Sequence, residues 1–108
     1  MAQYLLQVAY TPEAWAALTK NPQDRIEAVR PAVERLGGKI QGAWFAFGEY
    51  DIVAVFEMSD NVSAAAISIA FSAGGAVKSV KTTPLMTVAE GIEAMKKAGG
   101  AGYRPPTS

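Results

Sequence analysis

The chain has 108 residues and a mass of 11.4 kDa, which is the usual size of one domain with its own hydrophobic core. Half of the residues are apolar, only 19% are charged, and ten basic residues balance ten acidic ones. This composition excludes a disordered chain. The neutral charge gives no electrostatic reason to expect binding to nucleic acid or to an anionic membrane.

The sequence contains neither cysteine nor histidine. Disulfides, thiol nucleophiles, histidine relays and thiolate or imidazole metal sites are therefore excluded. We expect no metal and no cofactor. The first residues lack the basic segment of a secretion signal, and no apolar run is long enough to span a membrane. We therefore expect a cytoplasmic protein.

In chain order, the pattern predicts a strand over residues 3–10 and a short helix opened by Thr11-Pro12. Asn21-Pro22 is expected to start a second helix, with Asn as its N-cap, and Gly37-Gly38 to end it. One side of this helix is apolar and predicted to be buried. Its members are Ile26, Val29, Val33 and Leu36.

The basic residues of the second helix alternate with Glu27 and Glu34, so we interpret them as a solvated face with ion pairs along the helix. They are Arg25, Arg30 and Arg35, followed by Lys39.

The second half of the chain predicts strands over residues 39–47 and 51–58, joined by a tight connection through Gly48-Glu49. A helix over residues 62–73 follows, with Val62, Ala66, Ile69 and Ala70 along one side. Residues 76–86 are predicted to form a fourth strand. Thr87 to Glu90 form a capping box that opens a last helix, which runs through Lys97.

This order, β-α-β-β-α-β with a C-terminal helix, predicts an α+β ferredoxin-like fold with a four-stranded antiparallel sheet. Residues 1–98 form the domain, and residues 99–108 are expected to form an extended tail. The first three strands are apolar on both faces, although helices can cover only one of them. A second copy of the chain is the simplest cover for the other face.

Two segments carry a resemblance to a known family. They are Leu36-Gly37-Gly38-Lys39-Ile40 and Phe47-Gly48-Glu49-Tyr50-Asp51-Ile52-Val53, supported by Tyr10-Thr11, by the helix start at Asn21-Pro22 and Arg25, and by Lys81 to Thr87. Over residues 4–95 the chain resembles the GYD domain family, named for the residues matched here by Gly48, Tyr50 and Asp51. The resemblance implies a ferredoxin-like fold that pairs into a dimeric α+β barrel. It implies no activity.

The polar cluster Gly48 to Asp51 has two interpretations. As turn chemistry, Gly48 supplies a positive φ, Asp51 accepts backbone N–H bonds and Glu49 lies in water. As a site, Glu49 and Asp51 form an acid/base pair, and Tyr50 contributes its hydroxyl to a ligand. We predict a turn role for Asp51 and a ligand-binding role for Tyr50.

Four aromatic residues are predicted to share the face of the sheet without helices: Tyr4, Tyr10, Trp44 and Phe56. They are expected to line an apolar ligand cavity between paired sheets or to form the dimer interface. Together with Glu49, Tyr50 and Asp51 they are the candidate ligand-binding residues.

The predicted function is binding of a small, partly apolar molecule in a pocket between the sheets of a homodimer or larger homo-oligomer. Two alternatives remain. One is a cofactor-independent enzyme, similar to an isomerase or a monooxygenase, that acts on a small molecule. The other is a purely structural assembly unit. The missing histidine and cysteine weigh against the enzyme, because they are the readiest general base and nucleophile near neutral pH.

Overall fold

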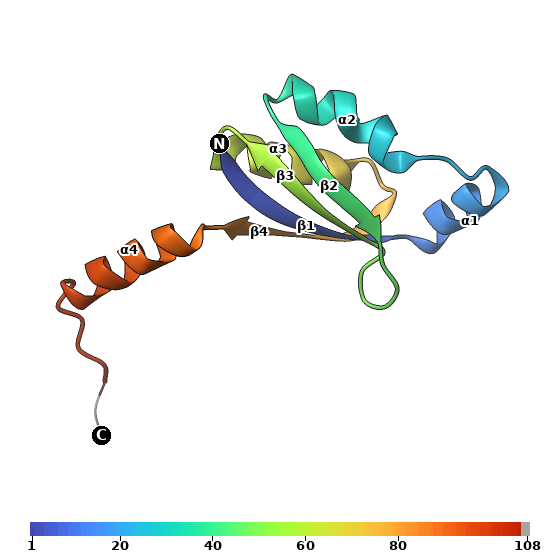
Figure 1. Ribbon diagram of the computed structural model, residues 1–108. Helices are drawn as coiled ribbons and strands as arrows, with labels where there is room; N and C mark the ends of the chain where they lie inside the picture. Colours follow the sequence, from blue (N-terminus) through green and yellow to red (C-terminus); the bar gives the residue numbers. More distant parts are fainter. Residues whose placement is uncertain (107–108) are drawn as a thin grey trace.

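The computed structural model describes residues 1–106 of the chain. Across these residues strands and helices follow one another along the chain (Figure 1). The strands are β1 (Ala2–Tyr10), β2 (Lys39–Phe45), β3 (Ile52–Met58) and β4 (Val77–Leu85). The helices are α1 (Pro12–Lys20), α2 (Arg25–Arg35), α3 (Asn61–Ala73) and α4 (Val88–Gly99).

The four strands form one sheet in the order β2-β3-β1-β4, and every neighbouring pair is antiparallel. The first and last strands of the βαββαβ unit are therefore adjacent, as in a ferredoxin-like fold. This arrangement confirms the predicted α+β class.

Helices α2 and α3 pack on the same face of the sheet and close the core there. Leu6, Met58, Val33 and Ile67 are almost fully buried in this layer. They come from β1, β3, α2 and α3, so the two central strands and both helices above them contribute. The predicted apolar side of the second helix is confirmed, because Val33 is buried and Ile26, Val29 and Leu36 pack against the core.

The predicted placement of three aromatic residues is wrong. Tyr4, Tyr10 and Phe56 lie on the face that the helices cover, and each is at most 9% exposed. Trp44 does lie on the other face, since it pairs with Val53 across the sheet. The strands are apolar on both sides, so alternation alone gives the partition into two faces but not which face the helices cover.

The face without helices keeps an apolar centre. Leu5, Val53 and Val55 are half-buried there by their neighbours in the sheet. Trp44 is 61% exposed, and its indole lies over Gly42, where a Cβ atom would meet the ring at 2.7 Å. No helix covers this face in the described residues.

Two boundaries differ from the predictions. Asp24, not Asn21, is the N-cap of α2, because its carboxylate accepts from the backbone N–H groups of Ile26 and Glu27 at 3.0 and 3.1 Å. Asn21 instead ends α1, donating its backbone N–H to Ala17. Strand β2 stops at Phe45, so its connection to β3 is a loop over residues 46–51 rather than a tight turn.

The outward side of α3 is also apolar. Val62 and Ile69, from the side picked out in the sequence, are 79% and 66% exposed, whereas Ala64 and Ile67 are the buried residues of this helix.

Helix α4 extends away from the sheet and the other helices (Figure 1). It begins with the predicted capping box of Thr87 and Glu90, and none of its residues is buried. Its apolar side is exposed at Val88, Ile92 and Met95. Residues 100–106 contain no helix or strand, and the end of the expected tail, residues 107 and 108, lies outside the described residues. Among residues 1–106, no helix has the length and apolar character needed to cross a bilayer.

Candidate functional site

A cavity of about 220 Å³ lies between the helix-covered face of the sheet and helices α2 and α3. Its floor comes from β1 and β3, and its sides come from α2, the C-terminal part of α3 and the start of β4. The lining is almost entirely aliphatic or aromatic: Leu6, Val8, Tyr10, Arg25, Ile26, Val29, Ile52, Ala54, Phe56, Ala70, Phe71, Gly74, Ala76 and Val77. A cavity with such a lining favours an apolar ligand.

Tyr10 and Arg25 supply the polar side chains of this lining. Burial raises the pKa of the Tyr10 hydroxyl, and the nearby Asp51 carboxylate adds to this, while the positive charge of Arg25 opposes it. The hydroxyl therefore stays protonated at neutral pH and can donate a hydrogen bond. The guanidinium of Arg25 lies close enough to act on it, so the two groups form one polar end of an otherwise apolar cavity.

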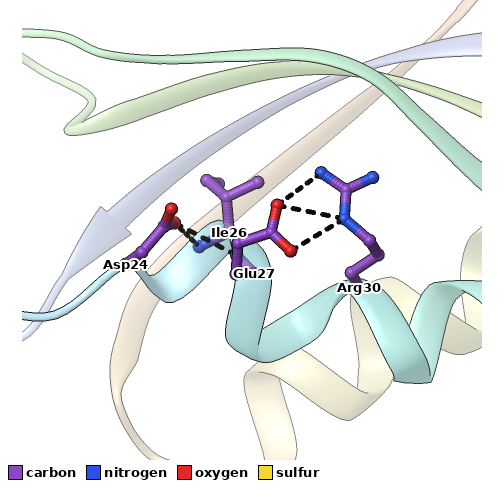
Figure 2. A network of polar contacts seen from close by, with 4 residues as sticks. All are labelled: Asp24, Ile26, Glu27 and Arg30. Atoms are coloured by element: carbon purple, nitrogen blue, oxygen red, sulfur yellow. Dashed lines mark hydrogen bonds and ion pairs between the residues drawn. The ribbon is translucent and has the colours of Figure 1, made fainter.

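Arg25 and Arg30 lie on the same helix but differ in their partners. Arg30 forms an ion pair with Glu27, with its Nη2 atom 2.9 Å from Oε1 and its Nε atom 3.2 Å from both carboxylate oxygens (Figure 2). Arg25 donates from Nη1 to the side-chain oxygen of Gln23 at 3.1 Å. Within residues 1–106 no carboxylate forms an ion pair with Arg25.

Asp51 forms hydrogen bonds that connect three elements beside Tyr10, one of the cavity residues. Its Oδ2 atom accepts from the backbone N–H of Tyr10 at 2.8 Å and from the indole N–H of Trp15 at 3.2 Å. Its own backbone N–H donates to the carbonyl of Val8 at 2.7 Å. The rings of Tyr10 and Trp15 meet edge to face, with centroids 5.4 Å apart. One carboxylate thus ties β1, α1 and the start of β3 together beside Tyr10.

The loop over residues 46–51 is closed by a hydrogen bond from the backbone N–H of Ala46 to the carbonyl of Asp51, at 2.8 Å. Gly48 has φ +127° within it, a conformation that side chains with a Cβ atom rarely adopt. The predicted positive φ of Gly48 is confirmed.

The GYD domain family matches residues 4–95 of the chain. The chain belongs to this family. A search of curated proteins finds no match to the sequence. The family match thus covers the sheet, α1, α2, α3 and most of α4.

Of the three residues that give the family its name, Gly48 and Asp51 have structural roles here. Asp51 accepts a backbone N–H, as predicted, although the donor belongs to β1 and not to the hairpin. Tyr50 is half-buried in the loop, and Glu49 is exposed. Neither Tyr50 nor Glu49 lines the cavity.

The aromatic candidates are divided between several places in this GYD domain. Tyr10 and Phe56 line the cavity. Tyr4 is buried beside it, and its hydroxyl donates to Oδ1 of Asn61 at the start of α3. Trp44 borders a separate, shallower hollow of about 440 Å³ along β2 and the start of α2. The structure does not bring the seven candidates together into one site.

Sequence reasoning missed Arg25, which it assigned to a solvated helix face. The signal was present, because Arg30 has Glu27 and Glu34 three and four residues away, whereas Arg25 has no acidic residue at those spacings. Arg25 also directly precedes Ile26, the first residue of the buried side. Among residues 1–106, no group of three or more carboxylates lies close enough together to hold a metal ion.

Proposed function

We propose that this GYD domain protein binds a small, partly apolar molecule in the cavity between α2, α3 and the sheet. The observation that carries the proposal is an apolar cavity of about 220 Å³, with a floor of buried strand residues and a mouth beside the exposed residues Ala70 and Gly74. The apolar surface that lines this cavity is open to water at the mouth, and burial of such surface by an apolar ligand is favourable by about 25 cal/mol per Å². A ligand that fills the cavity would remove this surface from water.

The cavity lies on the opposite side of the sheet from the pocket expected from the sequence. Its lining comes from one chain, so binding does not require a second copy to complete the walls. The residues Leu6, Ala54 and Phe56 form a rigid floor because they belong to the two central strands.

We also propose that the protein is a homodimer, in which a second copy covers the face of the sheet without helices. The apolar centre of that face and the exposed apolar side of α4 support this proposal. Stable interfaces usually bury more than about 1,200 Å² in total, which a whole sheet face can supply. Sedimentation at micromolar concentration tests it, and a monodisperse monomer would contradict it.

Ligand binding is tested with a matched pair of variants in α3. Both Ala70 and Ala65 are exposed, but Ala70 lies at the mouth of the cavity, whereas Ala65 does not line it. Ala70→Leu should narrow the mouth of the cavity, and Ala65→Leu should leave the cavity unchanged. Indole serves as the probe, because a small neutral aromatic molecule fits an apolar lining.

Indole should raise the Tm of the wild-type protein and of Ala65→Leu, because a ligand that binds only the folded state stabilises it. The shift should be small or absent in Ala70→Leu. Equal shifts in both variants, or no shift in the wild-type protein, would contradict binding in this cavity.

A further inference from the structure

The two polar side chains of the cavity lie at the same end, and their chemistry is specific. Arg25 supplies a permanent positive charge with several N–H donors in a planar arrangement. Tyr10 as a residue is 9% exposed, and its hydroxyl remains a donor at neutral pH. Both groups can therefore donate hydrogen bonds to the same acceptor.

Arg25 is also available for such an acceptor. Arg30, five residues further along α2, forms an ion pair with Glu27 (Figure 2), whereas Arg25 forms no ion pair within the described residues and donates to the neutral side-chain amide of Gln23. A guanidinium at the border of an apolar cavity is more weakly hydrated than an ammonium group and pairs well with a planar anion.

We infer that the ligand is a monocarboxylic acid whose carboxylate binds Arg25 and the Tyr10 hydroxyl, and whose apolar part fills the cavity. This inference rests on the proposed function and specifies its ligand class. A carboxylate accepts two parallel N–H bonds from a guanidinium and can still accept a third bond from a hydroxyl.

The surroundings favour a single negative charge over a double one. Asp51 lies near Tyr10, and its carboxylate already accepts from the backbone N–H of Tyr10 and the indole N–H of Trp15. A phosphate dianion would add a second charge beside this carboxylate and against apolar walls, where charge is costly to bury.

The volume limits the apolar part. A cavity of roughly 150 Å³ lined by aliphatic and aromatic residues takes benzene. The cavity of about 220 Å³ in this protein is therefore large enough for one ring with a short acidic arm, or for an aliphatic chain of similar volume.

Phenylacetate and phenylacetamide are the two probes for this inference, because they have nearly the same shape and differ in charge. Binding of each is measured by calorimetry to the wild-type protein and to two variants. Arg25→Gln removes the proposed partner of the carboxylate. Arg30→Gln removes a charge from the same helix that is already paired, so it is the matched control.

The wild-type protein should bind phenylacetate about tenfold or more tightly than phenylacetamide, as expected for hydrogen bonds to a charged group. Arg25→Gln should reduce this ratio to about one while phenylacetamide affinity stays within about twofold, and Arg30→Gln should keep the wild-type ratio. Circular dichroism confirms that each variant is folded.

A preference for the acid that survives in Arg25→Gln would overturn the inference. So would equal binding of both probes by the wild-type protein, although the cavity would then still bind ligands as proposed. Failure of indole and both probes to bind would instead overturn the proposed function itself.

Discussion

The two faces of the sheet carry similar side chains but have different surroundings. Leu6 is 1% exposed beneath α2 and α3, whereas its neighbour Leu5 points to the other face and is half-buried without any helix above it. The covered face contains both the core and the cavity that we propose binds a ligand. The other face and α4 have apolar surface that no described residue of the same chain covers. We therefore propose a different role for each face: the covered face binds the ligand, and the other face associates with a second copy of the chain.

The largest expected effect is a difference in unfolding free energy between alanine variants of these two leucines. Leu6→Ala should lower the free energy of unfolding by about 2–5 kcal/mol, the usual cost of truncating a fully buried leucine. Leu5→Ala should cost less than about 1 kcal/mol at concentrations low enough to keep the chain monomeric, because part of its surface is already in water. Urea unfolding measures both. Equal losses would remove the distinction between the faces.

Leu5→Ala should instead lower the stability of the associated protein. Its cost should therefore increase with protein concentration, since association stabilises the folded state by mass action. A cost that is the same at every concentration would contradict a role of this face in association.

Asp51→Ala should have the next largest effect, about 1–3 kcal/mol, because it leaves the buried backbone N–H of Tyr10 without its acceptor. Asp51→Asn keeps an oxygen acceptor and should cost less. Tyr50→Phe is the matched control in the same loop and should change neither Tm nor probe binding, since Tyr50 lies outside the cavity lining. Loss of binding in Tyr50→Phe at unchanged Tm would restore Tyr50 as a site residue.

Gly48→Ala should cost on the order of 1 kcal/mol, because alanine is strained at φ +127° although no atom lies within 4 Å of the added Cβ. Gly91→Ala in α4 also meets no neighbour, but its φ is not positive and alanine favours the helix. It should therefore be neutral or slightly stabilising. Thermal melts compare the two, and an equal loss of Tm in both variants would contradict the explanation by backbone strain.

The smallest effect on the single chain is expected in α4. Ile92→Ser should change the unfolding free energy of the monomer by less than about 0.5 kcal/mol, since this exposed side chain packs against nothing buried. Sedimentation should show weaker association for Ile92→Ser than for Glu93→Gln, which changes the polar side of the helix. Unchanged association in Ile92→Ser would exclude α4 from the interface.

The sequence predicted the order of elements, the sheet and the family, because helix caps, glycines and apolar spacing are local signals. It did not predict which face the helices cover. Tyr4, Leu6 and Val8 alternate with Leu5 and Ala9. Because both sets are apolar, the alternation does not show which set faces the helices. The start of α2 was misplaced because Asn21 and Asp24 are both good N-caps, and only the packing of Ile26 against the core decides between them.

The cavity is not the site expected from the sequence, which was placed on the other face of the sheet. Tyr10 and Phe56 do line the cavity, but Arg25 was assigned to the solvated face of its helix. A cavity forms from residues distant in the chain, such as Arg25, Phe71 and Val77, and no local pattern links them. The motif residues Gly48 and Asp51 are recognisable in the sequence because the loop requires them. Gly48 provides its positive φ, and Asp51 bonds the loop to β1.

Native mass spectrometry of the protein purified from its own host tests the central claim most directly, because one spectrum reports both association and retained ligand. We expect the mass of two chains of 11.4 kDa, each carrying one small acid that Arg25→Gln fails to retain. A spectrum of single chains without any bound molecule would contradict both the association and the binding assigned to the two faces.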